Sequence, residues 1–278
     1  MNTENSQCKQ GKVISFINMK GGVGKTTLCV NIGYTLAKHF NKKVLIIDMD
    51  PQFNATQALM EKFKNIQYYE AIRDQNKTIS YVLNHSYGGV ASKAPDLTLD
   101  DIIEDLETEN LHLIPGDLAI IDFESSRRGS ERILKEYIDK NNLTAIYEYI
   151  LIDAPPTYSI FSISSLIASD YYIVPIAPDV FSALGYDLLN RVISNDLALK
   201  GATVKELGIV FTLVDSDRMG RLNVMDSFEG HRTFDNKIKE HERIRTGKLE
   251  TYMLDMASTK DEIIQLTSEF KRKLEDDN

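Results

Sequence analysis

Residues 20–27 read Lys-Gly-Gly-Val-Gly-Lys-Thr-Thr, a composition that suits a loop binding phosphate groups. Its three glycines lack Cβ atoms, so successive backbone N–H groups can turn toward a phosphate chain. A helix expected to begin at about Thr26 adds the partial positive charge of its N-terminus, and Lys25 adds a full charge. The Thr26 hydroxyl is a suitable ligand for phosphate-bound Mg²⁺. The residues predicted to contact a nucleotide are Lys20, Gly21, Gly22, Val23, Gly24, Lys25, Thr26 and Thr27.

The octet departs from the common phosphate-loop pattern G-x-x-x-x-G-K-[ST] in one place. Met19 stands where that pattern has its first glycine, and the loop carries a second lysine, Lys20, five residues before Lys25. A glycine-rich turn without a ligand, in which Lys20 is simply solvated, is the alternative interpretation. The apolar run at 13–17 and the helical pattern after the loop favour a nucleotide site.

Three carboxylates stand at the ends of two other apolar runs. Asp48 and Asp50 follow residues 43–47, and Asp153 follows residues 149–152. Ligands of a parallel sheet gather beyond the carboxyl ends of its strands, so we expect these acids near the octet. Each acid alone is equally compatible with a helix cap or a turn. Together with the octet they predict support for Mg²⁺, with Asp153 in a Walker-B-like position.

Strand and helix patterns alternate along most of the chain. Strands are expected at 13–17, 43–47, 111–114, 149–153, 171–176 and 208–214, and helices at 26–40, 118–140, 143–147, 181–199 and 260–274. Residues 54–84 read as interrupted helix and 85–100 as a surface loop. This order predicts an α/β fold, a mostly parallel twisted sheet with helices on both faces. We expect a flexible tail at 1–11 and a single domain at 12–278.

Composition narrows the class of protein. A hydrophobic content of 42% and the absence of an apolar run of about 18 residues indicate a soluble protein. Two cysteines and a polar N-terminus indicate a cytoplasmic one, and no metal-ligand spacing is present. The net charge is −9, yet residues 218–248 hold eight Lys or Arg against five Asp or Glu, a local balance of +3. This basic segment suits a phosphate backbone and suits a solvated helical surface equally well.

Several of these motifs occur together and in a fixed order. They are the octet, Asp-Met-Asp-Pro-Gln at 48–52, Ile-Leu-Ile-Asp-Ala-Pro-Pro at 150–156, Pro-Ile-Ala-Pro-Asp at 175–179 and the strand at 208–216. From about residue 12 onward, the chain resembles the ParA family of deviant Walker P-loop ATPases, in the ParA/MinD superfamily. It resembles the short form, without an N-terminal helix-turn-helix. The resemblance implies ATP-dependent sandwich dimerisation, non-specific binding of double-stranded DNA, and hydrolysis stimulated by a ParB-like centromere-binding partner.

The resemblance also implies a role for each site residue. Lys25 would hold the β- and γ-phosphates of its own ATP, and Lys20 would reach the phosphates of the other protomer. Thr26 would bind Mg²⁺ directly, with Asp48 and Asp153 supporting the metal shell. Asp50 would orient or activate the attacking water. The candidate DNA-binding residues are Arg218, Arg221, Arg243, Arg245 and Lys248.

Two positions depart from the family pattern. Phe53 replaces a glycine, which puts the shape of that loop in question, and Asp217 lies beside Arg218, which weakens the DNA-binding role of Arg218. The resemblance leaves open a ParA-like positioner of protein cargo and a MinD-like membrane-cycling ATPase. The second predicts a basic amphipathic C-terminal helix, whereas residues 269–277 are acidic and poor in apolar side chains. We therefore expect no membrane partner and a cytoplasmic protein that associates with the nucleoid when it holds ATP.

Overall fold

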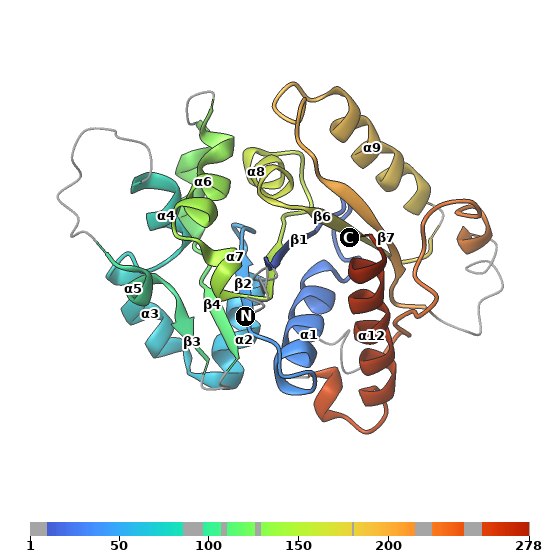
Figure 1. Cartoon of the computed structure of the whole chain (residues 1–278), viewed down its shortest axis with the longest axis horizontal. Helices are drawn as coiled ribbons and strands as arrows, with labels where there is room; N and C mark the ends of the chain where they lie inside the picture. Colours follow the sequence, from blue (N-terminus) through green and yellow to red (C-terminus); the bar gives the residue numbers. More distant parts are fainter. Residues whose placement is uncertain are drawn as a thin grey trace, which may run out of the picture.

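Seven strands form one sheet through the middle of the molecule (Figure 1), in the order β3-β4-β2-β5-β1-β6-β7. The computed structural model describes residues 10–85, 97–106, 110–125, 129–179, 181–214, 224–241 and 252–277. The strands are β1 (Lys12–Phe16), β2 (Val44–Asp48), β3 (Glu104–Asp105), β4 (Leu111–Ile114), β5 (Tyr149–Asp153), β6 (Tyr171–Ile176) and β7 (Lys205–Phe211). All pair in parallel except β3, which runs antiparallel to β4. The predicted mostly parallel sheet is confirmed.

Helices cover both faces of this sheet. The elements are α1 (Lys25–Lys38), α2 (Asn54–Phe63), α3 (Ile66–Asp74), α4 (Ile79–His85), α5 (Leu99–Ile102), η1 (Leu118–Ser125), η2 (Ser130–Arg132), α6 (Ile133–Lys140), α7 (Leu143–Ile146), α8 (Ile160–Ala168), α9 (Ser182–Asn195), η3 (Met253–Asp255) and α12 (Lys260–Asp276). Apolar side chains of α1, α2, η3 and α12 share one core cluster with the sheet. Those of α4, α6, α7, α8 and α9 pack in two clusters on the opposite face (Figure 1).

The strands form where the sequence has short, continuous apolar runs. Every residue of β2, β5 and β6 is buried, as expected for strands that helices cover on both faces. The predicted strand at 208–214 begins earlier and ends earlier, because Lys205 pairs with Tyr171 at the start of β6. At its other end, Leu213 has a φ of 52°, which is incompatible with extended backbone.

The predicted helix at 118–140 is broken into three pieces. A 3₁₀ segment, η1, is followed by η2 and α6, and Gly129 at the start of η2 has a φ of 98°. Strand β3 was not predicted, because two residues are too short for a periodic pattern. The interrupted helix at 54–84 is confirmed as α2, α3 and α4. At the end of the expected loop at 85–100, Thr98 caps α5, whereas 86–96 lie outside the described residues.

The N-terminal end of the described chain is packed against the domain. The backbone N–H of Gly11 donates to the carbonyl of Thr144 at 2.7 Å. A Cβ at Gly11 would lie 1.9 Å from the carbonyl oxygen of Tyr147, so no larger residue fits there without backbone movement. Residues 1–9 of the expected tail lie outside the described residues. Within the described ranges, no helix combines the length and the apolar character that a membrane span requires.

Candidate nucleotide-binding site

The octet forms the connection between β1 and α1, at the carboxyl edge of the sheet. Gly22 and Gly24 have φ values of 71° and 81°, in the left-handed region that favours glycine. Gly24 immediately precedes the first residue of α1, so the helix begins one residue earlier than predicted. Thr212, which follows β7, donates from its hydroxyl to the carbonyl of Val23 at 2.6 Å. The hydrogen bond from Thr212 therefore holds the loop in place before any ligand binds.

Lys25 lies in the interior of this loop and is only 6% exposed. Its Nζ donates to the carbonyl of Lys20 at 3.2 Å. Burial lowers the pKa of Lys25, and the nearby carboxylates of Asp153 and Asp50 act in the opposite direction. A buried ammonium is expensive unless anions compensate it, so this position favours a polyanionic ligand.

Asp153, at the end of β5, is fully buried beside the start of α1. Its Oδ2 accepts from the hydroxyl of Thr26 at 2.7 Å, and its Oδ1 has no hydrogen-bond partner among the described residues. Burial, followed by the charge of Asp48, raises the pKa of Asp153 well above its usual range. A cation at the free oxygen would remove this penalty. The pair of a hydroxyl and a carboxylate therefore fits a divalent metal ion.

The surroundings indicate which metal would fit. Within the described ranges, no group of three or more His, Cys, Asp or Glu side chains is placed to hold a metal ion. A metal at Thr26 and Asp153 must then obtain its remaining ligands elsewhere. Mg²⁺ fits this description, because proteins usually bind it through one or two of their own oxygens, with waters and substrate phosphates as the remaining ligands.

Asp48, at the end of β2, lies beside Asp153 in the strand register and is also fully buried. Its Oδ2 accepts from the backbone N–H and the hydroxyl of Thr56, both at 2.8 Å. Its Oδ1 accepts from the N–H of Asp50 at 3.2 Å. Burial is the largest influence and raises the pKa of Asp48 to about 7, although the Thr56 hydrogen bonds lower it. Asp48 thus anchors the loop that carries Asp50.

That loop positions Asp50 close to the octet. Asp50 is 6% exposed, and its Oδ1 accepts from the N–H of Gln52 at 2.9 Å. Phe53 has a φ of 41°, so it adopts the left-handed conformation that favours glycine. Its ring stacks on Tyr69 with centroids 5.5 Å apart, a contact that a glycine cannot make. Packing therefore holds Phe53 in a backbone conformation that is unfavourable for it.

Lys20 lies at the edge of the site and forms an ion pair with Asp179, which follows β6. The N–H of Lys20 donates to Oδ1 of Asn18 at 3.0 Å, and the amide of Asn18 donates to the carbonyl of Pro175 at 2.8 Å. These contacts connect the loop after β1 with the loop after β6, its neighbour in the sheet.

The structure brings together the octet, Asp48, Asp50 and Asp153 at one edge of the sheet. The five candidate DNA-binding residues Arg218, Arg221, Arg243, Arg245 and Lys248 lie outside the described residues. Sequence reasoning assigned no role to Asn18, Thr56 or Asp179. Asn18 and Asp179 each follow a predicted strand, which is a usable signal, whereas nothing local distinguishes Thr56.

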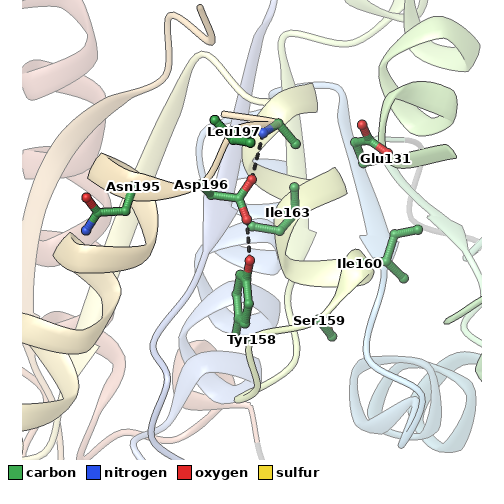
Figure 2. Close-up of a pocket in the computed structure, with 9 residues that line it drawn as sticks. Glu131, Tyr158, Ser159, Ile160, Ile163, Asn195, Asp196 and Leu197 are labelled. Carbon is green, nitrogen blue, oxygen red and sulfur yellow. Dashed lines mark hydrogen bonds between the residues drawn. The ribbon is translucent and has the colours of Figure 1, made fainter. Parts of the chain in front are cut away.

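A separate groove of about 710 Å³ opens between the start of α8 and the end of α9 (Figure 2). Tyr158 and Asp196 meet across it, where the phenol donates to the carboxylate. The other oxygen of Asp196 accepts from the N–H of Ala198 at 2.7 Å. Among the described residues that line the groove there is no lysine or arginine, so it does not have the chemistry of a triphosphate site.

Comparisons with known proteins identify relatives of this chain. A family model described as an AAA domain matches residues 11–200. The virulence plasmid ParA family protein pGP5-D of Chlamydia psittaci is 31% identical over 223 residues, which are 78% of this chain and 75% of that protein. The sporulation initiation inhibitor protein Soj of Bacillus subtilis is 32% identical over 209 residues, which are 71% of this chain and 73% of Soj.

A solved structure shares the fold. It is a Borrelia burgdorferi B31 protein assigned to plasmid partition, with AMPPNP bound, and it superposes with a TM-score of 0.77. The alignment covers 95% of this chain and 100% of that one at 24% identity, which establishes the fold alone. The sequence relatives carry the assignment further: the chain belongs to the ParA family of Walker-type ATPases, within the ParA/MinD superfamily.

Proposed function

We propose that this chain is a Mg²⁺-dependent ATPase that partitions DNA, such as a plasmid or a chromosome. ATP binding drives dimerisation and DNA attachment, and hydrolysis reverses both. Family membership supports a partitioning ATPase in general, since the relatives include the chromosome partitioning protein ParA of Myxococcus xanthus, 29% identical over 228 residues. The observation that carries the proposal is the arrangement of buried Lys25, half-buried Thr26 and buried Asp153 under a loop that also presents Lys20.

The chain's own groups divide the catalytic work. Lys25 holds the β- and γ-phosphates of the bound ATP, and its burial strengthens each charge interaction it makes. Asp50 orients or activates the attacking water, and Asp48 keeps the loop of Asp50 in place by accepting from the N–H groups of Asp50 and Thr56. The backbone N–H groups of the octet and the N-terminus of α1 supply further positive potential.

Thr26 and Asp153 are the residues that would hold Mg²⁺, with Asp48 as a neighbouring negative charge. When bound, Mg²⁺ neutralises the charge that develops on the phosphates during transfer. The cobyrinic acid a,c-diamide synthase of Mycobacterium smegmatis, which shares the fold at a TM-score of 0.72, has been solved with an ATP analogue and magnesium. The Oδ1 of Asp153, which has no hydrogen-bond partner among the described residues, supports the same cofactor here.

Two copies of the chain form the active dimer. Lys20 of each protomer reaches the triphosphate of the other, so the γ-phosphate links the two. With ADP this charge is lost and the equilibrium shifts toward monomer. The dimer binds double-stranded DNA without sequence preference through Arg218, Arg221, Arg243, Arg245 and Lys248, and a ParB-like partner stimulates hydrolysis.

The membrane-cycling alternative is disfavoured by the C-terminal helix. Ile263, Leu266 and Phe270 of α12 are fully buried in the core cluster shared with α1. The apolar face of α12 is therefore used inside the domain. A positioner of protein cargo would use the same ATPase cycle and differs only in what the partner protein carries.

DNA retention in the presence of ATP, ADP or no nucleotide tests the proposal. The wild-type chain should be retained only with ATP and should elute as a dimer under the same condition. Lys25→Ala should abolish ATP binding in calorimetry. Asp50→Ala should bind ATP and stay on DNA as a trapped dimer, because hydrolysis no longer releases it.

Lys20→Ala separates nucleotide binding from dimerisation. This variant should bind ATP yet stay monomeric in sizing runs. Lys42→Ala is the matched control, because Lys42 is also ion-paired and its side chain is 31% exposed against 29% for Lys20. Equal dimerisation of the two variants would exclude the trans role, and ATP binding by Lys25→Ala would exclude the site.

A further inference from the structure

Lys20 is engaged within its own chain before any partner is present. Its ammonium pairs with the carboxylate of Asp179 from the loop after β6. We propose that Asp179 is a positioning residue that holds Lys20 in the free protomer, so that dimerisation requires the partner's triphosphate to displace this carboxylate. This inference rests on the proposed trans role of Lys20.

The surroundings of Lys20 limit where its side chain can go. Its backbone is tied to Asn18, and the start of α9 passes directly over both residues. A Cβ at Gly185 would lie 3.3 Å from Oδ1 of Asn18 and 3.5 Å from Cβ of Lys20. The lysine stem therefore leaves the backbone beside α9, on the side where Asp179 lies.

Asp179 is held in place by groups other than Lys20. Its Oδ1 accepts from the N–H of Phe181 at 2.9 Å and from the hydroxyl of Ser182 at 3.2 Å. The N–H of Asp179 donates to the same hydroxyl at 3.0 Å. These bonds leave Oδ2 directed at the ammonium. Because the acceptor is already ordered, pairing requires the ordering of only one flexible side chain.

The Lys20–Asp179 ion pair is weak enough for the partner's triphosphate to replace it. The side chains of Lys20 and Asp179 are 29% and 46% exposed, so water and salt screen their attraction. Exposed pairs of this kind change an equilibrium by up to about fivefold each. A symmetric dimer breaks two of them, so the two pairs together should weaken dimerisation by roughly tenfold and by no more than about 25-fold. A triphosphate carries more charge than one carboxylate and can displace it, whereas ADP lacks the terminal phosphate.

Asp179→Asn is the direct test. Asparagine removes the charge but keeps a side-chain oxygen for Phe181 and Ser182. With AMPPNP, sedimentation should show a dimer dissociation constant about tenfold lower than that of the wild type, and with ADP the variant should stay monomeric. Glu148→Gln is the matched control, since it frees Lys42 from a pair at 2.8 Å with exposures of 31% and 50%. It should leave the dimer constant unchanged.

A second measurement tests the Lys20–Asp179 ion pair in the absence of a dimer. In nucleotide-free protein, reductive methylation followed by mass spectrometry should show Lys20 reacting several times faster in Asp179→Asn, with Lys42 unchanged. In Glu148→Gln the pattern should be reversed. Unchanged reactivity of Lys20 would overturn the inference, and so would an unchanged or weaker dimer in Asp179→Asn when wild type dimerises through Lys20. A wild type that stays monomeric with AMPPNP would instead overturn the proposed function, while the methylation rates still report on the pair.

Discussion

Replacement of Asp48 by asparagine should change how the stability of the nucleotide-free protein depends on pH. Asp48 is fully buried at the end of β2, and burial raises its pKa from 3.8 to about 7. A carboxyl group whose folded pKa is raised stabilises the fold below its unfolded pKa. That contribution is lost as the pH rises from about 4 through 7, because the unfolded chain releases this proton at about pH 4 whereas the folded state retains it until about pH 7.

The size of the effect follows from the two pKa values. Each pH unit between them costs about 1.4 kcal/mol. Relative to strongly acidic solution, the wild type should lose about 1–2 kcal/mol by pH 5 and about 3 kcal/mol more by pH 8. The difference of about 3 kcal/mol should be absent in Asp48→Asn. Loss of an acceptor for Thr56 or Asp50 lowers the variant's stability by about 1–2 kcal/mol, but by the same amount at every pH.

Urea unfolding of both proteins at pH 5, 6, 7 and 8, without nucleotide or Mg²⁺, measures this difference. The variant should be about as stable as wild type at pH 5 and should exceed it by about 3 kcal/mol at pH 8. Other carboxylates titrate in both proteins and largely cancel. Asp153 adds to the gain, since the charge of Asp48 raises its pKa. Parallel curves for the two proteins would refute the raised pKa of Asp48.

Three further outcomes are expected. Gly33→Ala places a Cβ 2.8 Å from Cδ1 of Ile46 and 3.3 Å from Cδ1 of Leu151, so thermal unfolding should show a loss of about 1–2 kcal/mol after the gain in helix propensity. Thr212→Val removes the hydrogen bond to Val23, so calorimetry should show ATP binding weakened by roughly 5- to 30-fold; unchanged affinity would mean that this bond does not shape the loop. DNA binding through about five phosphate contacts should fall roughly 500-fold between 50 and 200 mM salt, and a flat response would exclude it.

The phosphate loop and the acids around it could be predicted because their signals are local. Glycines at positive φ, a lysine at the start of a helix, and acids at the ends of apolar runs each appear within a few residues. A parallel sheet then brings separate strand ends together without further information, as it does for Asp48 and Asp153. The ends of helices and strands were predicted less accurately. Gly129 and Leu213 have positive φ values and change the backbone direction inside the predicted helix at 118–140 and the predicted strand at 208–214.

The contacts that organise the site could not be predicted in the same way. Lys20 and Asp179 are 159 residues apart in the chain, and no spacing rule connects them. Thr56 reaches Asp48 only because α2 folds back beside β2. Thr212 reaches Val23 because the backbone leaves the sheet after β7. Each of these contacts depends on tertiary packing, which a single sequence does not display.

In the absence of a ligand, burial disfavours the charged forms of the ionisable side chains in the site. The pKa of buried Lys25 is lowered and those of Asp48 and Asp153 are raised, so in the free protein each group is pushed toward its neutral form. A triphosphate favours the charged lysine, and a divalent cation favours the charged carboxylate. The triphosphate therefore offsets the cost of burying a charged lysine, and the metal ion offsets the cost of burying charged carboxylates in the same pocket. Neither ATP nor Mg²⁺ alone offsets both costs. Together they should therefore stabilise the fold by more than the sum of their separate effects.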